Sequence, residues 1–413
     1  MSGVEMKGLL KKNGTRTILA SLLSIIIGML AGSVIITIVG LSNDTLGAKG
    51  VWDGIRIVFL GLFVKARDAA GNLVFAFNPQ MMGNMLFRAI PVIMTGLSVA
   101  VANKTGLFNI GAPGQYLAGT AATLFIALSM PVTGSEMTAW YAAQGVEFAV
   151  TFPAWLVWVL AFLGGMAAGA LWGSIPGLLK ALLNINEVLA CIMTNWIAAN
   201  LVTWAFDISS LKNVVENTKT GYIYKTSFNG VETAKMGLDK LFPGSQVNGG
   251  IIIAAIFAVV VYIMLSRTTF GYELKACGSN RLAARYAGIK DKRSIVISMA
   301  IAGALAGAAG SLYYLAGNTE FFWSTYQSLP AVGFNGIPVA LLAANNPIAV
   351  VFTGMFMSML DICGLQLTNL TGFNEYITDV IIAVIVYLAA FSLVIKMLIG
   401  KLGRKHAGKE EGK

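Results

Sequence analysis

Residues Thr17–Leu41, TILASLLSIIIGMLAGSVIITIVGL, form an apolar run without a single charged side chain. A helix needs about 20 mostly apolar residues to cross the hydrocarbon core of a bilayer, so this run is long enough. Four basic residues precede it, as at the start of a signal peptide, but the run is longer than the apolar part of such a peptide. We therefore predict an uncleaved membrane-spanning helix.

The rest of the chain has the composition of a protein with many such spans. Of its 413 residues, 56% are hydrophobic and 12% are charged, whereas an average soluble domain has about 25% charged residues. The 46 glycines fit the same class, because glycine is commoner in membrane helices than in soluble ones. This composition excludes a set of soluble domains and predicts an all-α, polytopic membrane protein.

Ten apolar segments are long enough to be candidate spans. They cover about 17–41, 86–102, 112–130, 154–179, 187–206, 250–265, 294–316, 329–344, 347–366 and 378–398. The sequence thus divides into an N-terminal segment 1–16, a transmembrane domain 17–398 and a basic tail 399–413.

The distribution of charge places both termini in the cytoplasm. With the N-terminus inside, 19 of the 29 basic residues lie on the inner side, seven of them between Arg267 and Arg293, as the positive-inside rule requires. Segment 266–293 is then a cytoplasmic loop, and 42–85 and 207–249 are external loops. The first external loop contains an apolar run, Ile55–Val64, that is too short to span and is expected in the membrane interface.

Two segments at membrane depth are interrupted by glycine and proline: Asn109–Tyr116 (NIGAPGQY) and Gly333–Pro338 (GFNGIP). A continuous helix through them is costly, and broken helices often mark a substrate site. Close packing of small residues is the alternative explanation. Leu107–Gly111 at the opening of the third span and Gly333–Ile337 at the start of the eighth share Phe-Asn near glycine. The ten spans are therefore compatible with a 5+5 inverted repeat, and a chance match is the alternative.

Amides and aromatic rings accompany these breaks, and the fifth predicted span adds a further amide beside Trp196. Buried amides need partners and rarely face lipid, and amides with aromatic faces suit a flat, polar, uncharged ligand. The substrate pathway is expected to include Phe108, Asn109, Gln115, Asn195, Phe334 and Asn335. Glu187, near the inner end of the fifth span, is expected to pair with Lys180 rather than with a substrate.

No residue pattern points to catalysis or to a metal site. The single histidine, His406, lies in the charged tail, and the three cysteines are far apart without metal-ligand spacing. The net charge of +10 is explained by the cytoplasmic loops, so nucleic acid is not expected as a partner. We predict that the chain is not an enzyme.

The cytoplasmic loop contains a short helix after a turn. Asn280 is a good N-cap, Ala283 and Ala284 favour helix, and Gly288 can end it. Such a helix is either a solvated connector or a docking element for a cytoplasmic partner.

Several stretches resemble the permease subunits of ATP-binding-cassette importers, in the group that holds permeases for ribose, galactosides and branched-chain amino acids. Within that group the chain most resembles nucleoside permeases. The stretches are Asn103–Gly111, Asn186–Val188, Ala283–Ile289, Gly333–Ile337 and Val339–Leu342. One position departs from the pattern: Pro113 stands where nucleoside permeases usually have a glutamate, so any role of that acid is absent or relocated.

The resemblance implies that transport and ATP hydrolysis are carried out by different subunits. No Gly-x-x-x-x-Gly-Lys-[Ser/Thr] phosphate loop occurs in the sequence, so this chain needs no cofactor and ATP and Mg are expected on a partner ATPase. The residues expected to couple to that ATPase are Gly278, Asn280, Ala283, Ala284 and Arg285. Further expected partners are a second permease subunit, which for nucleosides is often a different chain, and an external substrate-binding lipoprotein or periplasmic binding protein, all at the bacterial plasma membrane.

The resemblance implies nucleoside import, driven by ATP hydrolysis on the partner. The pathway residues include no cation to match a phosphate or a carboxylate, which weighs against nucleotides and free amino acids. A permease for a simple sugar is the alternative. An ion-coupled secondary transporter would need ionisable residues near the membrane midplane, where only Asp361 is expected.

Overall fold

The computed structural model describes residues 13–42, 46–219, 221–324 and 327–389, together with positions 391, 394 and 397. Residues 1–12 of the predicted N-terminal segment, and all of the basic tail 399–413, lie outside the described residues. The chain forms two compact units. The first contains residues 1–85, 341–344 and 356–413, and the second contains residues 86–340 and 345–355.

A helix lies at each of the ten predicted spans. These helices are α2 (Asn13–Leu41), α4 (Pro79–Lys104), α5 (Ala112–Ser129), α7 (Ala154–Leu183), α8 (Glu187–Asp207), α10 (Gly250–Arg267), α13 (Asp291–Tyr314), α14 (Ala331–Leu342), α15 (Pro347–Leu370) and α16 (Glu375–Ala389). Among the described residues, seven helices are long and apolar enough to cross a membrane, namely α2, α4, α7, α8, α10, α13 and α15. The prediction of a helical, polytopic membrane protein is confirmed.

The predicted span 329–344 is shorter than expected. Helix α14 has 12 residues, which gives it a length of about 18 Å at 1.5 Å per residue. That is well below the hydrocarbon thickness of about 30 Å. A helix of this length crosses part of a bilayer only.

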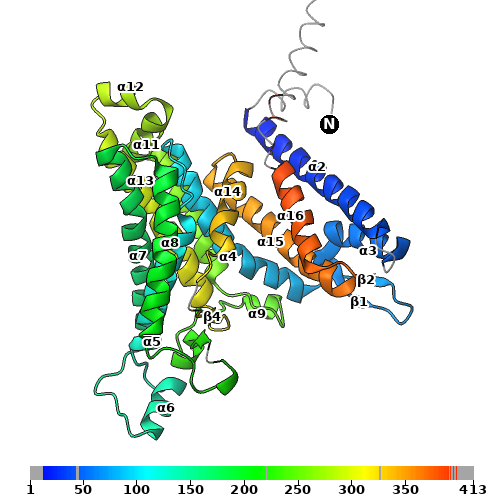
Figure 1. Cartoon of the computed structure of the whole chain (residues 1–413), viewed down its shortest axis with the longest axis horizontal. Helices are drawn as coiled ribbons and strands as arrows, with labels where there is room; N and C mark the ends of the chain where they lie inside the picture. The colour runs from blue at the N-terminus through cyan, green and yellow to red at the C-terminus, as the bar shows by residue number, and fades with distance from the viewer. Residues whose placement is uncertain are drawn as a thin grey trace, which may run out of the picture. The chain divides into compact units, whose positions relative to one another are not determined.

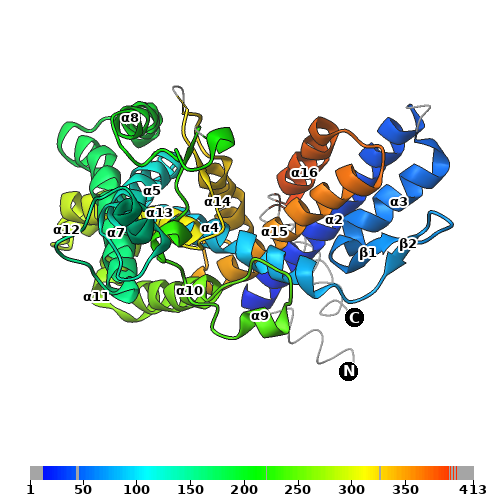
Figure 2. The same ribbon diagram turned by 90° about the horizontal axis from the view of Figure 1, so that it is seen from below.

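The first unit is a layer of helices with a small hairpin. Helix α2 packs against α3 (Gly47–Leu60) and α16, and strands β1 (Val64–Arg67) and β2 (Leu73–Phe75) pair antiparallel beside them. The neighbouring helices can be followed in Figures 1 and 2. Segment 42–85, expected as an external loop, is therefore largely regular structure. Its apolar run is buried within this unit at Ile57 and Val58, which pack in the same core cluster as α15 and α16.

An arginine joins three parts of the first unit. The Arg67 Nη1 atom lies 2.7 Å from Oδ2 of Asp53 on α3, and Arg67 Nε donates to the carbonyl oxygen of Leu370 at 3.0 Å. The Asp53 side chain is buried, and a buried carboxylate is stable only when it is paired. Arg67 thus fixes the hairpin to α3 and to the end of α15.

The second unit is built on a close contact between glycines of three helices. Gly169 of α7 faces Gly303 and Gly307 of α13, and a Cβ atom added at Gly169 would lie 2.8 Å from the Cα atom of Gly307. Gly119 of α5 packs on Gly307 in the same way. Small residues let membrane helices approach backbone to backbone. Helices α5, α7 and α13 are accordingly packed side by side (Figures 1 and 2).

Segment 207–249, expected as an external polar loop, is ordered and tied to the second unit. Its strand β3 (Tyr222–Ile223) pairs antiparallel with β4 (Phe321–Phe322). The short elements α6 (Glu136–Ala143), η2 (Asn217–Lys219), η3 (Thr226–Asn229) and α9 (Leu238–Leu241) complete this region. The side chain of Asn229 donates to the carbonyl oxygens of Ala127 and Met130, both at 2.7 Å, which fixes the segment to the end of α5.

Ion pairs reinforce the β3–β4 pairing. Glu320, just before β4, lies 2.6 Å from Lys219 and 3.2 Å from Lys225 on either side of β3. The hydrogen bond from Lys219 holds the pKa of Glu320 below its ordinary value.

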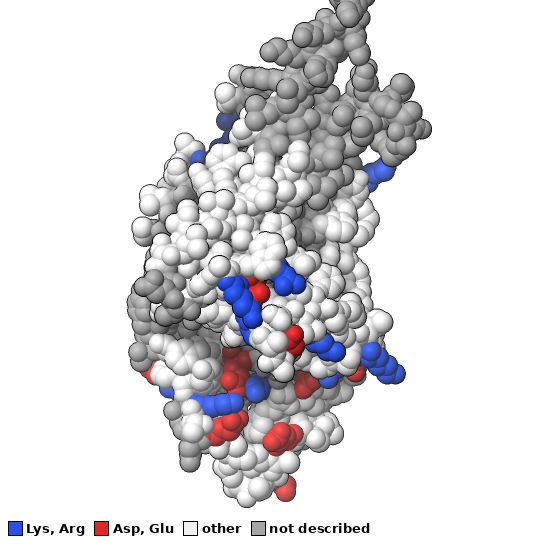
Figure 3. All heavy atoms as spheres, turned by 90° about the vertical axis from the view of Figure 1, so that its right-hand side faces the viewer, with Lys and Arg blue, Asp and Glu red and all other residues white. Residues whose placement is uncertain are grey.

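The surface has a broad area without charge. On the face shown in Figure 3, the acidic and basic side chains of the described residues gather toward one end, beside a wide uncharged area. This distribution is expected for a surface that faces lipid.

The glycine contact leads to a first prediction. Gly169→Val should destabilise the protein strongly, because overpacking at a site of this kind costs about 1–3 kcal/mol or more. The measurement is the thermal unfolding midpoint in detergent, with Gly50→Ala as the control, since the nearest atom to a Cβ at Gly50 is at an ordinary 3.4 Å. Equal midpoints for Gly169→Val and wild type would contradict the packing.

The ion pairs of Glu320 lead to a second prediction. Because the folded-state pKa of Glu320 is depressed, its contribution is complete above the ordinary carboxyl pKa and is lost as the pH falls through the lower, folded value. Hydrogen exchange at β4, corrected for intrinsic rates, should therefore accelerate in this acid range. Glu320→Gln should show that acceleration at neutral pH, and Glu136→Gln, at an exposed carboxyl, should not.

Candidate translocation site and coupling loop

The break between α4 and α5 is closed by a pair of amides. Asn109 Nδ2 donates to Gln115 Oε1 at 2.8 Å, and Gln115 Nε2 donates back to Asn109 Oδ1 at 3.0 Å. Asn109 Nδ2 also donates to Ser98 Oγ at 3.0 Å. Both amides are buried, with Asn109 0% exposed. The pair holds the chain in its non-helical course before α5.

Asn195 of α8 supports the same break from the other side. Its Oδ1 accepts from the backbone N–H of Gly114 at 2.9 Å, and its Nδ2 donates to the carbonyl oxygen of Ile110 at 3.0 Å. The first N–H groups of a helix lack partners within it, and at membrane depth protein groups must supply them. Asn195 thus satisfies backbone groups that the break leaves free.

The two segments rich in glycine and proline touch each other. The prediction that the helix is broken at Gly333–Pro338 is wrong, because this segment lies within the continuous helix α14, whereas the first segment contains the turn before α5. A Cβ atom added at Gly333, in the first turn of α14, would lie 2.5 Å from the Cα atom of Pro113 in the first turn of α5. Helix α14 also packs on α4, where Thr95 Oγ1 donates to the carbonyl oxygen of Val332 at 3.1 Å. The start of α14 therefore lies against both α4 and α5, within the second unit.

The structure brings several predicted pathway residues together, but some of them already form hydrogen bonds with protein groups. Asn109, Gln115 and Asn195 are buried and bind protein groups, whereas Phe108, Phe334 and Asn335 are half-buried. Sequence reasoning missed that Asn195 supports the break, because its partners Gly114 and Ile110 are 81 and 85 residues away in the chain. As the structure stands, any contact of these three amides with a ligand requires them to exchange partners.

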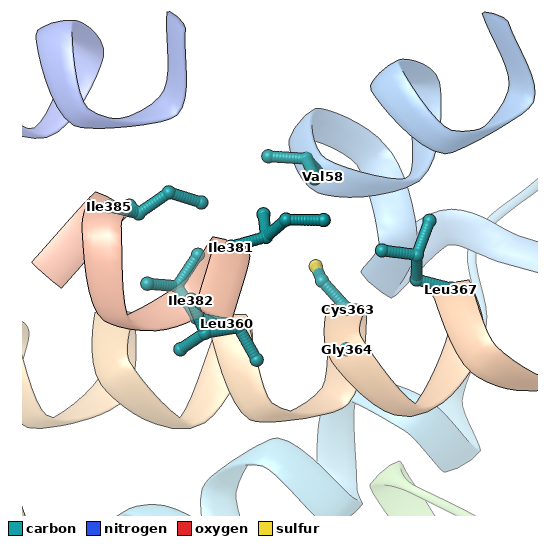
Figure 4. A pocket seen from close by; sticks show the side chains of 8 residues that line it. All are labelled: Val58, Leu360, Cys363, Gly364, Leu367, Ile381, Ile382 and Ile385. Carbon is teal, nitrogen blue, oxygen red and sulfur yellow. The ribbon is translucent and has the colours of Figure 1, made fainter. Parts of the chain in front are cut away.

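A pocket in the first unit is unsuited to a polar ligand (Figure 4). It is lined by Val58, Leu360, Cys363, Gly364, Leu367, Ile381, Ile382 and Ile385. Apart from the thiol of Cys363, the lining side chains are apolar. It can hold apolar groups, and it offers no partners for hydroxyls or amides.

Segment 266–293, predicted as a cytoplasmic loop, folds as two short helices, α11 (Thr269–Ser279) and α12 (Arg281–Tyr286), beyond one end of α7 and α13 (Figure 1). Asn280 caps α12 as predicted, accepting from the N–H of Ala283 at 3.0 Å. Gly288 ends it with a φ of +84°, a conformation that favours glycine. An ion pair of 2.7 Å between Arg281 and Asp291 ties α12 to the start of α13.

Two of the predicted coupling residues are used within the chain, which corrects the expectation that they face a partner. A Cβ atom added at Gly278 would lie 2.9 Å from the backbone nitrogen of Gly106, so Gly278 packs against the turn after α4. Ala284 is 4% exposed. Asn280, Ala283 and Arg285 remain exposed.

The exposed face of α12 includes two residues that the sequence analysis missed. Leu282 is 69% exposed and Tyr286 is 94% exposed. Their spacing of four residues places them on one face of the helix, and this spacing is the signal that could have identified them. Two large apolar side chains on the outside of a charged loop are typical of a docking surface.

Two other sequence predictions can be compared with the structure. Lys180 and Glu187 form the expected ion pair, at 3.0 Å. Within the described part of the chain, no three His, Cys, Asp or Glu side chains are grouped so that they could hold a metal ion.

Residues 81–390 match the family model described as "Branched-chain amino acid transport system / permease component". The chain belongs to this family. As a permease whose described residues include seven apolar helices of membrane length, it is a multi-pass protein of the plasma membrane, as the sequence predicted.

Curated relatives cover nearly the whole permease. The guanosine ABC transporter permease protein NupP of Bacillus subtilis is 33% identical over 392 residues, which is 94% of this chain and 98% of NupP. The nucleoside ABC transporter permease protein NupB of Lactococcus lactis is 34% identical over 94% of this chain and 95% of NupB. The glucose ABC transporter permease protein TsgB13 of Haloferax volcanii is 27% identical over 80% of this chain and 82% of TsgB13. The resemblance to nucleoside permeases is confirmed.

Proposed function

We propose that this permease forms the pathway for nucleosides in an importer driven by ATP hydrolysis on a separate subunit. The observation that carries the proposal is the contact between Pro113 at the start of α5 and Gly333 at the start of α14, beside the buried amides of Asn109, Gln115 and Asn195. The family membership and the names of the relatives NupP and NupB support it.

The chemistry of the site favours a neutral ligand. The proposed pathway residues are asparagine, glutamine and phenylalanine, so they contain donors, acceptors and ring faces but no cation. The charge of a nucleotide would be unmatched there, and burying an unmatched charge is very costly. A nucleoside offers a flat ring and hydroxyls without that charge.

A simple sugar is the second candidate. The name of TsgB13 supports it, and amides bind sugar hydroxyls as well as they bind bases. Competition for uptake by a nucleoside but not by a sugar separates the two functions.

We infer a topology of ten membrane elements with both termini in the cytoplasm. In this topology α5, α14 and α16 are the shorter elements, and the two segments rich in glycine and proline lie at the starts of α5 and α14. A 5+5 inverted repeat would place these two segments at equivalent positions.

We infer three partners for this permease. An ABC ATPase binds the cytoplasmic loop and carries ATP and Mg. A second permease subunit, different from this chain, completes the pathway. An external binding protein delivers the ligand. Leu282 and Tyr286, with Ala283 and Arg285, form the surface of α12 that meets the ATPase, while Asn280 holds α12 as its N-cap.

The pathway proposal predicts the effect of removing amides. Asn335→Leu and Asn109→Leu should each abolish guanosine uptake in cells that express the complete importer, since leucine cannot hydrogen-bond to the ligand. Asn200→Leu is the matched control, because Asn200 is an exposed asparagine of α8. Since Asn109 is buried, Asn335→Leu is the cleaner variant, and copurification of the ATPase reports intact assembly. Normal guanosine uptake by both variants would contradict the assignment of Asn109 and Asn335 to the pathway.

The coupling proposal predicts a different phenotype. Tyr286→Ser should weaken binding of the ATPase by roughly thirtyfold, because a large exposed anchor typically contributes about 2 kcal/mol or more to an interface. Membrane insertion should stay unchanged, since Tyr286 makes little contact within the chain. Tyr272→Ser is the control, at another exposed tyrosine, on α11. Full ATPase binding and transport by Tyr286→Ser would show that α12 is a connector.

A further inference from the structure

Four aromatic side chains from three helices meet in the second unit. Phe87 of α4 stacks on Tyr313 of α13, with ring centroids 5.4 Å apart and an interplanar angle of 18°. Tyr314 lies edge-on to Tyr313 at 5.2 Å. The side chain of Tyr116 on α5 lies close to that of Tyr314. We call Phe87, Tyr116, Tyr313 and Tyr314 the tyrosine cluster.

The tyrosine cluster adjoins the contact between the starts of α5 and α14. Tyr116 follows Pro113 by three residues on α5, so the two lie on neighbouring faces, one turn apart. Pro113 is the residue that Gly333 of α14 touches. Phe87 is on α4, the helix that binds α14 through Thr95. The cluster therefore lies beside the proposed pathway.

A hydroxyl without a partner lies next to the cluster. Thr120 is fully buried one turn beyond Tyr116, and within the described part of the chain its Oγ1 atom has no hydrogen-bond partner. Across the contact between α5 and α13, Thr120 faces Gly310, which lies one turn before Tyr314 on α13. Leaving a buried hydroxyl unpaired costs about 1–3 kcal/mol. A ligand or a second conformation that supplies a hydrogen-bond partner removes this cost.

The four side chains of the tyrosine cluster differ in their exposure. Phe87 and Tyr116 are buried, whereas Tyr313 and Tyr314 are half-buried. Phe87 fixes the ring of Tyr313 through the stack. Tyr314 is held beside Tyr116 and by an edge-on contact with Phe321 at 5.4 Å. Tyr313 and Tyr314 can therefore present ordered, partly exposed side chains to a ligand.

We propose that Tyr313 and Tyr314, held by Phe87 and Tyr116, select the base of the nucleoside as it passes the α5–α13 side of the pathway. This inference rests on the proposed nucleoside function and adds the residues that determine specificity. The ring of Tyr313 stacks on the base, and the Tyr314 hydroxyl bonds to its polar edge. A base stacked on an aromatic side chain gains about 1–3 kcal/mol, which a pentose without a base lacks.

Two variants separate the ring from the hydroxyl. Tyr313→Leu removes the stacking face, and Tyr314→Phe keeps the ring and removes the hydroxyl. The control is Tyr224→Phe, at a tyrosine that stacks on Phe228 at 4.7 Å in the outer aromatic core. Each variant is expressed in the complete importer, with its membrane level measured. Guanosine uptake is recorded together with competition by adenosine, uridine and ribose.

Tyr313→Leu should raise the KM for guanosine by roughly tenfold, as expected for a lost stacking contact. Tyr314→Phe should change the ratio of inhibition by purine and pyrimidine nucleosides by about fivefold, since one hydrogen bond contributes about 1 kcal/mol. Tyr224→Phe should match wild type in both measurements. KM does not depend on the membrane level, so reduced expression alone cannot produce the result.

The inference is overturned if wild type imports guanosine while both variants keep its KM and the competition ratios within about twofold. The tyrosine cluster is then packing alone. If wild type imports ribose or glucose and no nucleoside, the proposed function itself has failed. These two failures are distinguished by the wild-type measurement.

Discussion

The close approach of α7, α13 and α5 through glycine is the constraint on which the second unit depends. Gly169, Gly303 and Gly307 leave no room for a side chain between α7 and α13, so these helices have one way to pack. Gly119 adds α5 to the same contact. Once α5 is fixed, its first turn, with Pro113, is fixed as well. The place where α14 meets α5 follows from this packing.

The amides at the break between α4 and α5 stabilise the break without a ligand, and they can also exchange hydrogen-bond partners with one. Asn109, Gln115 and Asn195 satisfy one another and the free backbone groups, so the broken chain is stable without a ligand. Amides also exchange partners at a small net cost, because a new hydrogen bond replaces the old one. We therefore regard the break as a place where a neutral polar ligand can compete with protein groups, linking transport to movement of α5 and α14.

The sequence predicted structural features that depend on neighbouring residues. It did not predict those that depend on residues far away in the chain. Apolar runs located the helices, the Asn280 cap depends on its own next three residues, and Lys180 and Glu187 pair across one short turn. Ala284 looked available because its burial is set by packing that short-range patterns do not report. The partners of Asn195 are 81 and 85 residues away, and no periodicity in the chain indicates them.

The central claim is that the starts of α5 and α14 touch at Pro113 and Gly333 and, as we propose, that this contact changes during transport. Cysteines introduced by Pro113→Cys and Val332→Cys, with the three native cysteines replaced by alanine, test it most directly, because they leave Gly333 in place where a side chain would meet the backbone. In membranes containing the complete importer, a short bifunctional thiol reagent should cross-link the two positions efficiently without ligand. Guanosine, the binding protein and ATP together should reduce the cross-linking. Absence of a cross-link under every condition would contradict the account.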